Sequence, residues 1–567
     1  MKNFTKSLFI GAILYITLPL IGYAQSRERT IEEMETIAKN FLLENKAAKF
    51  SSRVNDVSHQ SHKLRMIKAS SLLGTTANSP KTEPFYIFTP DSMSRGFVII
   101  SGIDSMPAVL GYSLCETFDS LNIPCGMYFL LTEYAKNISK GNNYKELSLS
   151  AINTQEVYPL LGDIKYDQYA PFNEKCPIYN GKHTVTGCTA TAMSQVMAYW
   201  RYPAQMQGEN INYTTKTLGL NVTWDCGSTK FDWDNMLGTY LPGQYTESQG
   251  DAVATLHAAC GASLGVDYGP TGTGSTRHSA YGLYEYMGYD RDMTFAKANY
   301  FTDESFCSYI MEEVSNGRPI QACGAPETGS PHAFVIDGFQ IKENVPYFHV
   351  NWGWSGDWDG YFLINKMVVG NNKNYGDHDV ILITGIKPED SQDDGCAFGM
   401  TNVSLNKETV KGGEELRIET TQLANSSVSS FSGTLLAYAV DESQNEYLLG
   451  TYFEYPDEWK SRAGFSTFER RLNVPFTIPT GDYTVILKSK RYNSSVERTM
   501  MCPSFPRLHI ENISDGVVEE QQYENKVQSC YSTDGRKLST PVNGINIVRY
   551  VDGTVRKVMK KFNGSEP

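Results

Sequence analysis

The sequence shows none of the short motifs that mark the common metal and cofactor enzymes. It has no HExxH zinc motif, no phosphate-binding Walker loop and no Rossmann glycine pattern. Its cysteines form no CxxC pair and no tight zinc cluster. No block of Lys and Arg stands out on a chain of net charge −13, and phosphate binding needs a positive field. We therefore expect no metal, no cofactor and no nucleic-acid partner.

Long apolar runs are also scarce, and the clearest one is at the N-terminus. Lys2 and Lys6 precede an almost wholly apolar stretch from Ser7 to Gly22, and the small residue Ala24 follows it. This order is typical of a signal peptide cleaved after Ala24, with an uncleaved membrane anchor as the alternative. We expect a secreted protein. Its 11 Cys residues are an odd number, so at least one thiol stays unpaired.

With 567 residues, the chain is long enough for about two to four domains. An amphipathic helix at 30–50 and several short apolar strands precede a polar linker at 141–155. Short alternating strands beyond residue 396, separated by Gly, Ser and Asn, indicate an immunoglobulin-like sandwich. The divisions that we expect are 1–24 (signal peptide), 25–155 (α+β segment), 156–388 (the block with the chemistry), 396–512 (sandwich) and 513–567 (a small β unit).

Cys188 is the candidate nucleophile. It opens an expected helix that is rich in small residues and ends at Tyr202-Pro203. The positive end of a helix dipole stabilises a thiolate, which is the nucleophilic form of cysteine. Gly187 permits a close approach just before it. A buried cysteine without chemistry is the alternative interpretation of this motif.

His332 is the candidate general base among the nine His residues. It opens an apolar strand directly after a Gly-Ser-Pro loop, which places an imidazole at a strand start beside a cleft. It follows Cys188 by about 140 residues, the spacing expected when papain-like enzymes take Cys from a helical half and His from a later β half. The pair predicts thiol-based acyl transfer.

An imidazole base needs an acceptor that orients it. Asp337 is close in sequence, but in a regular strand it points to the opposite face from His332. Asn351 is the better candidate, because its amide oxygen can hold an imidazole N–H while Trp352 shields that bond from water. For the oxyanion hole we expect the backbone N–H of the nucleophile and the side chain of Gln168.

Five motifs follow one another in the block 156–388. They are Tyr166-Asp167-Gln168, Thr186-Gly187-Cys188, Val266-Asp267-Tyr268-Gly269-Pro270, His332-Ala333-Phe334-Val335-Ile336-Asp337-Gly338 and His349-Val350-Asn351-Trp352-Gly353-Trp354. In this order they resemble the streptopain family of cysteine peptidases, which have a papain-like fold. The resemblance implies Cys188 as nucleophile, His332 as base, Gln168 in the oxyanion hole and Asn351 as support. It also implies hydrolysis of protein and peptide substrates through a thioester acyl-enzyme.

Upstream, much of 28–150 is similar to the inhibitory propeptide of the same family. The chain is therefore expected to be a zymogen whose own propeptide is its inhibitor, cleaved between about 141 and 157, where an accessible linker invites nicking. The resemblance also implies which residues border the substrate cleft. They are Trp352, Gly329, Ser330 and, in the loop Gly272–Arg277, Ser275.

The C-terminal unit contains Asp-Gly turns between alternating apolar residues, which predict β-hairpins. A small stabilising β module is the simplest interpretation. The order of Gly535, Gly544-Ile545-Asn546-Ile547-Val548 and Asp552-Gly553 also resembles the C-terminal sorting domain of the type IX secretion system. That resemblance implies contact with secretion machinery and a location outside, or on the surface of, a Gram-negative bacterium.

The expected fold class is α+β: a papain-like core of two subdomains, preceded by an α+β propeptide and followed by an immunoglobulin-like β-sandwich and a small β sorting module. Two other functions use parts of the same pattern. An amidase or transglutaminase shares the Cys/His chemistry, and a surface binding protein would use the sandwich alone. The presence of Cys188, His332, Asn351 and Gln168 argues against the binding protein, and a masking propeptide favours a peptidase over the other enzymes.

Overall fold

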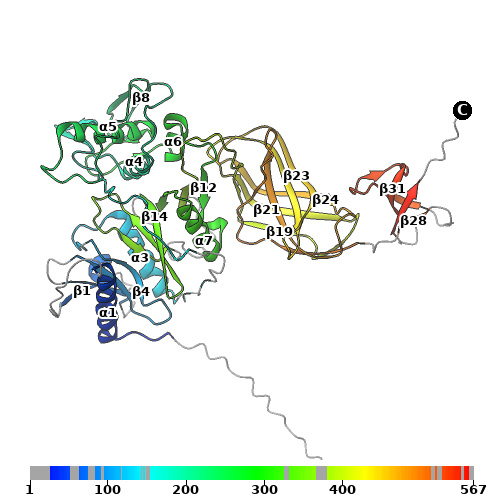
Figure 1. Ribbon diagram of the computed structural model, residues 1–567, viewed down its shortest axis with the longest axis horizontal. Coiled ribbons are helices and arrows are strands. Elements are labelled where there is room, and N and C mark those ends of the chain that lie inside the picture. The colour runs from blue at the N-terminus through cyan, green and yellow to red at the C-terminus, as the bar shows by residue number, and fades with distance from the viewer. Residues whose placement is uncertain are drawn as a thin grey trace, which may run out of the picture.

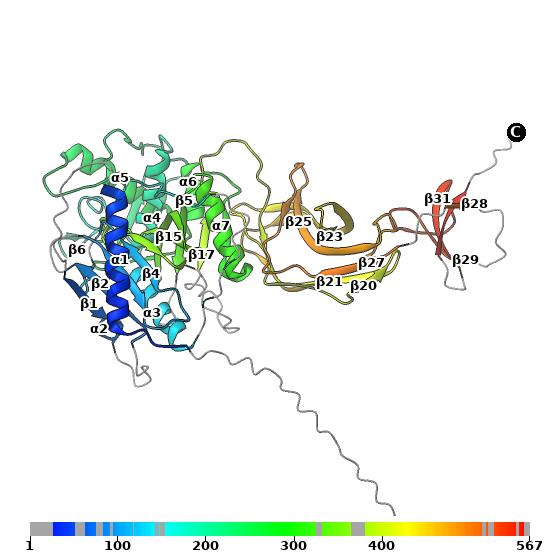
Figure 2. The same ribbon diagram turned by 60° about the horizontal axis from the view of Figure 1, so that its bottom comes forward.

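One antiparallel sheet organises the N-terminal part of the protein, whose computed structural model is shown in Figures 1 and 2. Its strand order is β1-β2-β3-β4-β16-β15-β14-β13-β17-β12, and β5 pairs with β14. The structure describes residues 26–50, 63–74, 83–90, 95–116, 118–141, 144, 147, 154–324, 331–364, 380–512, 517–519, 527–550 and 555–560. The expected signal peptide, Gly329, Ser330 and Asp552-Gly553 lie outside these residues.

Strands from both sides of the expected maturation linker build this sheet. They meet where β4 pairs with β16, with Gly111 opposite Phe362 and Tyr112 opposite Tyr361. The strands are β1 (Leu64–Lys68), β2 (Phe85–Pro90), β3 (Phe97–Ser101), β4 (Val109–Ser113), β5 (Glu156–Val157), β12 (Thr294–Lys297), β13 (Ile320–Gly324), β14 (His332–Lys342), β15 (Val345–Asn351), β16 (Gly360–Phe362) and β17 (Ile381–Thr384). The strands of residues 25–155, the expected propeptide region, thus extend the sheet formed by residues 156–388.

Helices cover both faces of the sheet, because successive strand residues point to opposite sides. Phe334 and Ile336 of β14 face a core shared with α3 and α7, whereas Ala333 and Val335 face a second core that contains α4. The helices are α1 (Ile31–Phe50), α2 (Ala69–Leu73), α3 (Cys125–Ser139), α4 (Cys188–Trp200), α5 (Glu247–Ser263), α6 (Ser279–Met287), α7 (Asp303–Ser315) and the 3₁₀ turn η1 (Ala298–Tyr300). In Figure 1, α4, α5 and α6 form a helical half above the sheet half.

The helical half also holds three short two-stranded ribbons. They are β6 (Ile178–Tyr179) with β7 (Lys182–His183), β8 (Ile211–Thr214) with β9 (Asn221–Trp224), and β10 (Val266–Asp267) with β11 (Gly274–Ser275). A helical half packed against a sheet half is the papain-like arrangement, so the α+β prediction for this block is confirmed.

The first helix is amphipathic, as its sequence predicts. Met34, Ala38 and Leu42 of α1 are buried against Val98 and Ile100 of β3, on the face of the sheet opposite α3. Figure 2 shows α1 lying beside β2 and β4. The propeptide region therefore contributes a helix on each face of the shared sheet.

A β-sandwich follows the peptidase-like block. One sheet contains β18 (Phe398–Gly399), β19 (Asn402–Leu405), β21 (Glu415–Asn425) and β24 (Gly464–Asn473). The other contains β20 (Thr409–Lys411), β22 (Phe431–Val440), β23 (Glu446–Trp459), β25 (Gly481–Arg491), β26 (Arg498–Thr499) and β27 (Arg507–Glu511). Alternate residues of β21, β22 and β25 are buried and form one apolar core between the sheets.

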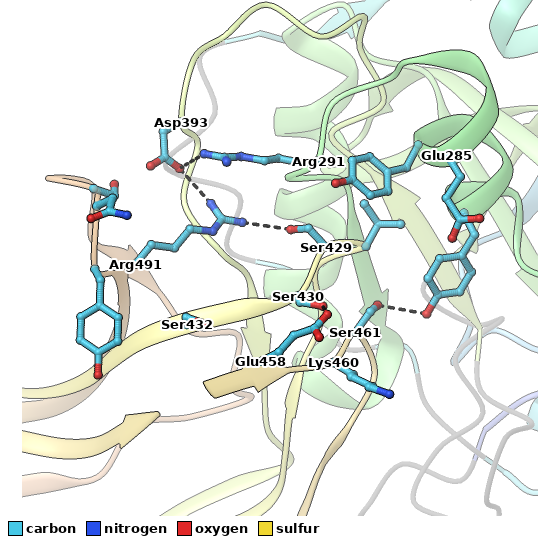
Figure 3. A pocket seen from close by; sticks show the side chains of 16 residues that line it. Glu285, Arg291, Asp393, Ser429, Ser430, Ser432, Glu458, Lys460, Ser461 and Arg491 are labelled. Carbon is cyan, nitrogen blue, oxygen red and sulfur yellow. Dashed lines mark hydrogen bonds and ion pairs between the residues drawn. The ribbon is translucent and has the colours of Figure 1, made fainter. Parts of the chain in front are cut away.

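The sandwich joins the preceding block through hydrogen bonds and ion pairs at β12 and the residues just before it. The Phe295 N–H donates to the Ser426 carbonyl at 2.7 Å. The Arg491 guanidinium donates to Asp292 at 2.6 Å and to Asp393 at 2.9 Å. Figure 3 shows Arg491 directed at the Asp393 carboxylate. Because Asp292 and Arg491 are largely buried, removing either one leaves the other charge without its partner.

A small five-stranded sheet ends the chain, in the order β28-β32-β31-β29-β30. Its strands are β28 (Val517–Glu519), β29 (Val527–Tyr531), β30 (Lys537–Leu538), β31 (Gly544–Tyr550) and β32 (Val555–Lys560). The ring of Tyr531 lies tilted against the ring of Phe476 of the sandwich, with ring centroids 5.8 Å apart. Within the described ranges, no helix combines the length and the apolar character needed to cross a membrane.

Candidate active site

Cys188 is the first residue of α4, as the sequence predicts. Gly187 precedes it with φ 90°, in the region that favours glycine, and a Cβ there would overlap the Thr273 hydroxyl. Ala190 and Ala192 are buried and let the helix pack closely in the centre of the domain. The local sequence thus places a half-buried thiol at the positive end of a helix.

His332, the first residue of β14, lies in hydrogen-bonding contact with the Cys188 thiol. Burial alone raises the pKa of Cys188, but the charge of His332 and hydrogen bonds from His332, the Ala333 N–H and the Thr189 hydroxyl lower it to about 7. Burial alone lowers the pKa of His332, but the Cys188 thiolate and the contacts of the imidazole raise it. The two shifts favour a thiolate–imidazolium pair.

Other thiols in the protein behave in the opposite way. Burial raises the pKa of Cys176, Cys260 and Cys323 to about 12. These side chains are suited to packing as neutral thiols, whereas Cys188 is suited to nucleophilic attack. Among the residues that the structure describes, no three His, Cys, Asp or Glu side chains come together in a way that could hold a metal ion.

The carbonyl of Trp352 is the acceptor that holds His332. The imidazole Nε2–H donates to it at 3.1 Å. Asn351, the sequence candidate for this contact, acts one step away: its amide oxygen accepts the Gly353 N–H at 3.0 Å, and its amide nitrogen donates to the Ile164 carbonyl at 2.9 Å. The Gly353 N–H and the Trp352 carbonyl belong to the same peptide group, so Asn351 holds the group that holds the imidazole.

A sequence signal for this geometry exists. Asn side chains commonly bond the backbone N–H two residues on, which forms an Asx-turn, and Asn351 is followed by Trp352 and Gly353. Gly353 has φ 73°, which glycine adopts without strain. Asp337, the other sequence candidate, belongs to a different pair, because it accepts from His349 Nδ1 at 2.6 Å and from the Leu161 N–H at 3.0 Å.

Gln168 lies beside the segment that leads to the nucleophile. Its backbone carbonyl accepts the Thr186 N–H at 3.2 Å, and the residue is 8% exposed. Ser275 is an exposed residue of β11, two positions after the Thr273 side chain that touches Gly187. The structure thus brings Gln168 and the Ser275 loop to the start of α4, and Trp352 to the imidazole.

Helix α3 of the propeptide region lies directly on this site. A Cβ at Gly126 would overlap the ring atoms of both His332 and Trp352. Farther along the same helix, Phe129 packs so closely on Gly324 that a Cβ there would also overlap it. The sequence gives no local signal for these contacts, since they join residues that are about 200 positions apart.

A thiol of lowered pKa against an imidazole, between a helical half and a sheet half, defines the class of papain-like cysteine hydrolases. The chain belongs to the Peptidase C10 (streptopain) family, which residues 166–362 match, and residues 27–138 match the Spi protease inhibitor family. Streptopain of Streptococcus pyogenes is 30% identical over 325 residues, which cover 52% of this chain and 78% of that relative.

Two further relatives come from other bacteria. The thiol protease/hemagglutinin PrtT of Porphyromonas gingivalis is 25% identical over 406 residues, which cover 68% of this chain and 44% of that protein. A solved fragment of prointerpain A from Prevotella intermedia is 29% identical, covers 57% of this chain and 98% of its own, and has a TM-score of 0.47. The family membership makes this chain a cysteine peptidase with an inhibitory propeptide domain, which confirms the function predicted from the sequence.

Proposed function

We propose that Cys188 and His332 are the catalytic pair of this peptidase. The Cys188 thiolate attacks the scissile carbonyl, and the resulting oxyanion is stabilised by the Cys188 N–H at the start of α4 and by the Gln168 amide. The His332 imidazolium gives its proton to the leaving amine, which departs and leaves a thioester. His332 then takes a proton from water, the hydroxide attacks the thioester, and the thiolate is restored.

One observation carries this assignment: the Cys188 thiol and the His332 imidazole are in contact, and each shifts the pKa of the other toward the charged form. Trp352 and Asn351 support the imidazole through the peptide group described above. Trp352, Ser275, Gly329 and Ser330 are proposed to border the bound protein or peptide substrate.

We also propose that residues 25–155 keep the enzyme latent until they are cut away between about 141 and 157. The position of Gly126 on the His332 and Trp352 rings supports this, because α3 occupies the space above the pair. The pairing of β5 with β14, at Val157 opposite Phe339, supports a new N-terminus held at the edge of the mature sheet.

A Cys188→Ala variant tests both proposals. Cleavage of casein should fall to background, and the protein should accumulate as the longer precursor if processing is autocatalytic. Cys502→Ala is the matched control, since Cys502 is also a half-buried thiol but belongs to the sandwich. Mass spectrometry of the processed control should place the mature N-terminus between 141 and 157. Normal casein cleavage by Cys188→Ala would refute the catalytic assignment.

We propose further that the protein is secreted. The apolar stretch before Ala24 supports a cleaved signal peptide, and the glycine-punctuated hairpins of 513–567 support a sorting domain read by type IX secretion machinery of a Gram-negative bacterium.

A further inference from the structure

Asp359 is a buried carboxylate beside the catalytic pair that the sequence motifs do not single out. It directly precedes β16, and it is 5% exposed. Its Oδ1 atom accepts the Trp352 N–H at 2.9 Å. Trp352 is the residue whose carbonyl accepts from His332. Trp352 therefore links the two groups: its N–H donates to the Asp359 carboxylate, and its carbonyl accepts from the His332 imidazole.

The two polar groups of Trp352 belong to consecutive peptide groups. Asp359 fixes the first group through its N–H, and Asn351 fixes the second group through the Gly353 N–H. With both groups fixed, the φ and ψ angles of Trp352 cannot rotate, and its carbonyl stays aimed at His332. An acceptor that is already oriented costs no reorganisation when the imidazole becomes charged.

The Trp352 side chain adds a second reason for precise placement. Its ring is fully buried, packs on Phe334 with centroids 5.0 Å apart, and donates its indole N–H to the Trp358 carbonyl at 3.2 Å. These contacts fix the position of the Trp352 side chain, but they do not set the direction of its carbonyl. That direction depends on the hydrogen bonds of the backbone. Among those hydrogen bonds, Asp359 supplies the carboxyl oxygen that accepts the Trp352 N–H.

We propose that Asp359 is a positioning residue of the peptidase, which aims the Trp352 carbonyl at His332 and thereby keeps the imidazole oriented toward Cys188. The inference rests on the proposed role of His332 as base. Asp359 acts through the backbone and does not touch the substrate.

Several charged groups face Asp359. Burial is the largest effect and raises the pKa of the Asp359 carboxyl to about 7, whereas His349 of β15, the hydrogen bond from the Trp352 N–H and Lys165 lower it, and Glu116 of the propeptide region raises it. His349 is itself held by Asp337, at 2.6 Å. A neutral carboxyl keeps a carbonyl oxygen that can accept the Trp352 N–H, so the positioning role needs the acceptor and not the charge.

Two substitutions distinguish the hydrogen-bond acceptor of Asp359 from its charge. Asp359→Asn keeps an acceptor of the same size without the charge, and Asp359→Leu keeps the approximate size without an acceptor. In the processed enzyme, Asp359→Leu should lower kcat by about tenfold to a hundredfold, the scale of a misplaced reacting group, with KM changed less than about twofold. Asp359→Asn should keep kcat within about twofold at pH 7.

The pH profile supplies a readout that a purely structural role would not move. The Trp352 carbonyl raises the pKa of His332, so losing its aim should shift the alkaline limb of kcat/KM to lower pH in Asp359→Leu. That limb should stay in place in Asp359→Asn. Asp357→Asn is the control, because Asp357 is an exposed carboxylate two residues away and should leave both kcat and the profile unchanged.

Two outcomes would overturn the proposal. One is a folded Asp359→Leu enzyme with normal kcat and an unmoved alkaline limb; the other is an Asp359→Asn enzyme that loses more than about tenfold in kcat, which would assign the role to the charge. The second outcome can be read even if Asp359→Leu fails to fold. A failure of the dyad assignment is distinct, since it appears as activity in Cys188→Ala.

Discussion

The propeptide region and the β-sandwich both flank the peptidase domain, but they are joined to it in different ways. The propeptide strands continue the central sheet at β4 and β16, and its apolar residues, such as Phe97 and Leu130, share a core with Ile336 and Phe348. The sandwich has a core of its own, drawn from Cys396 to Ile510. The propeptide region thus shares a sheet and a core with the peptidase domain, whereas the sandwich folds around a separate core and contacts the peptidase domain at its surface.

This difference bears on function because the core shared with the propeptide region includes Trp352, which contacts His332 of the catalytic pair. Helix α3 buries its apolar face in that core and brings Gly126 onto His332. The ion pair that Arg491 of the sandwich forms instead reaches Asp292, two residues before β12. We therefore expect substitutions in the propeptide region to change the reactivity of Cys188. Substitutions in the sandwich or in the C-terminal sheet should leave that reactivity unchanged.

The largest effect should come from enlarging Gly126. In full-length Gly126→Leu, the new side chain would overlap His332 and Trp352, so α3 could not seat on the pair. Cys188 should then react with iodoacetamide at least about tenfold faster than in the unprocessed parent, since accessible low-pKa thiols react fastest. Tyr128→Leu, on an exposed position of α3, should remain as slow as the parent. An unchanged rate in Gly126→Leu would show that α3 does not restrict the site.

Much of the local structure was accessible from the sequence. Short apolar runs before the linker predicted strands where β2, β3 and β4 lie, and amphipathic spacing predicted α1. The Gly187-Cys188 and Pro331-His332 boundaries also predicted the start of α4 and of β14, because each lies where a loop residue meets a run of uniform periodicity. The candidate pair could therefore be selected without the fold.

The contacts between these elements could not be predicted in the same way. Which strand β4 joins, and that Gly126 meets His332, depend on how distant segments pack, and no periodicity encodes that. Asn351 was selected from its neighbourhood as the acceptor of the imidazole, but the structure places the Trp352 carbonyl between it and the imidazole. Asp359 was missed because an acidic residue before a short strand resembles an ordinary turn residue.

A smaller effect should appear in the titration of the nucleophile. In the processed enzyme, alkylation of Cys188 should follow thiolate formation with a midpoint near the pKa of about 7. His332→Ala removes the charge that opposes burial, so the thiol pKa should rise and the midpoint should move to higher pH. His509→Ala, which removes an exposed imidazole of the sandwich, should leave the midpoint in place. If the parent, His332→Ala and His509→Ala all have the same midpoint, His332 does not influence the pKa of the Cys188 thiol.

The smallest effect on catalysis should come from deleting 513–567. The small sheet that contains β28–β32 touches the sandwich at Phe476 and Tyr531, and the sandwich core is complete without it, so the peptidase should retain its full rate on casein after purification. If the sheet is a sorting domain, the truncated enzyme should instead accumulate in the periplasm, whereas the full chain appears outside the cell. A Tyr531→Ala variant serves as control, because it loosens the contact with the sandwich but keeps the glycine-punctuated hairpins. Normal release of the truncated enzyme from the cell would reject the sorting role. A loss of casein cleavage by the purified truncated enzyme would show that the small sheet stabilises the rest of the protein.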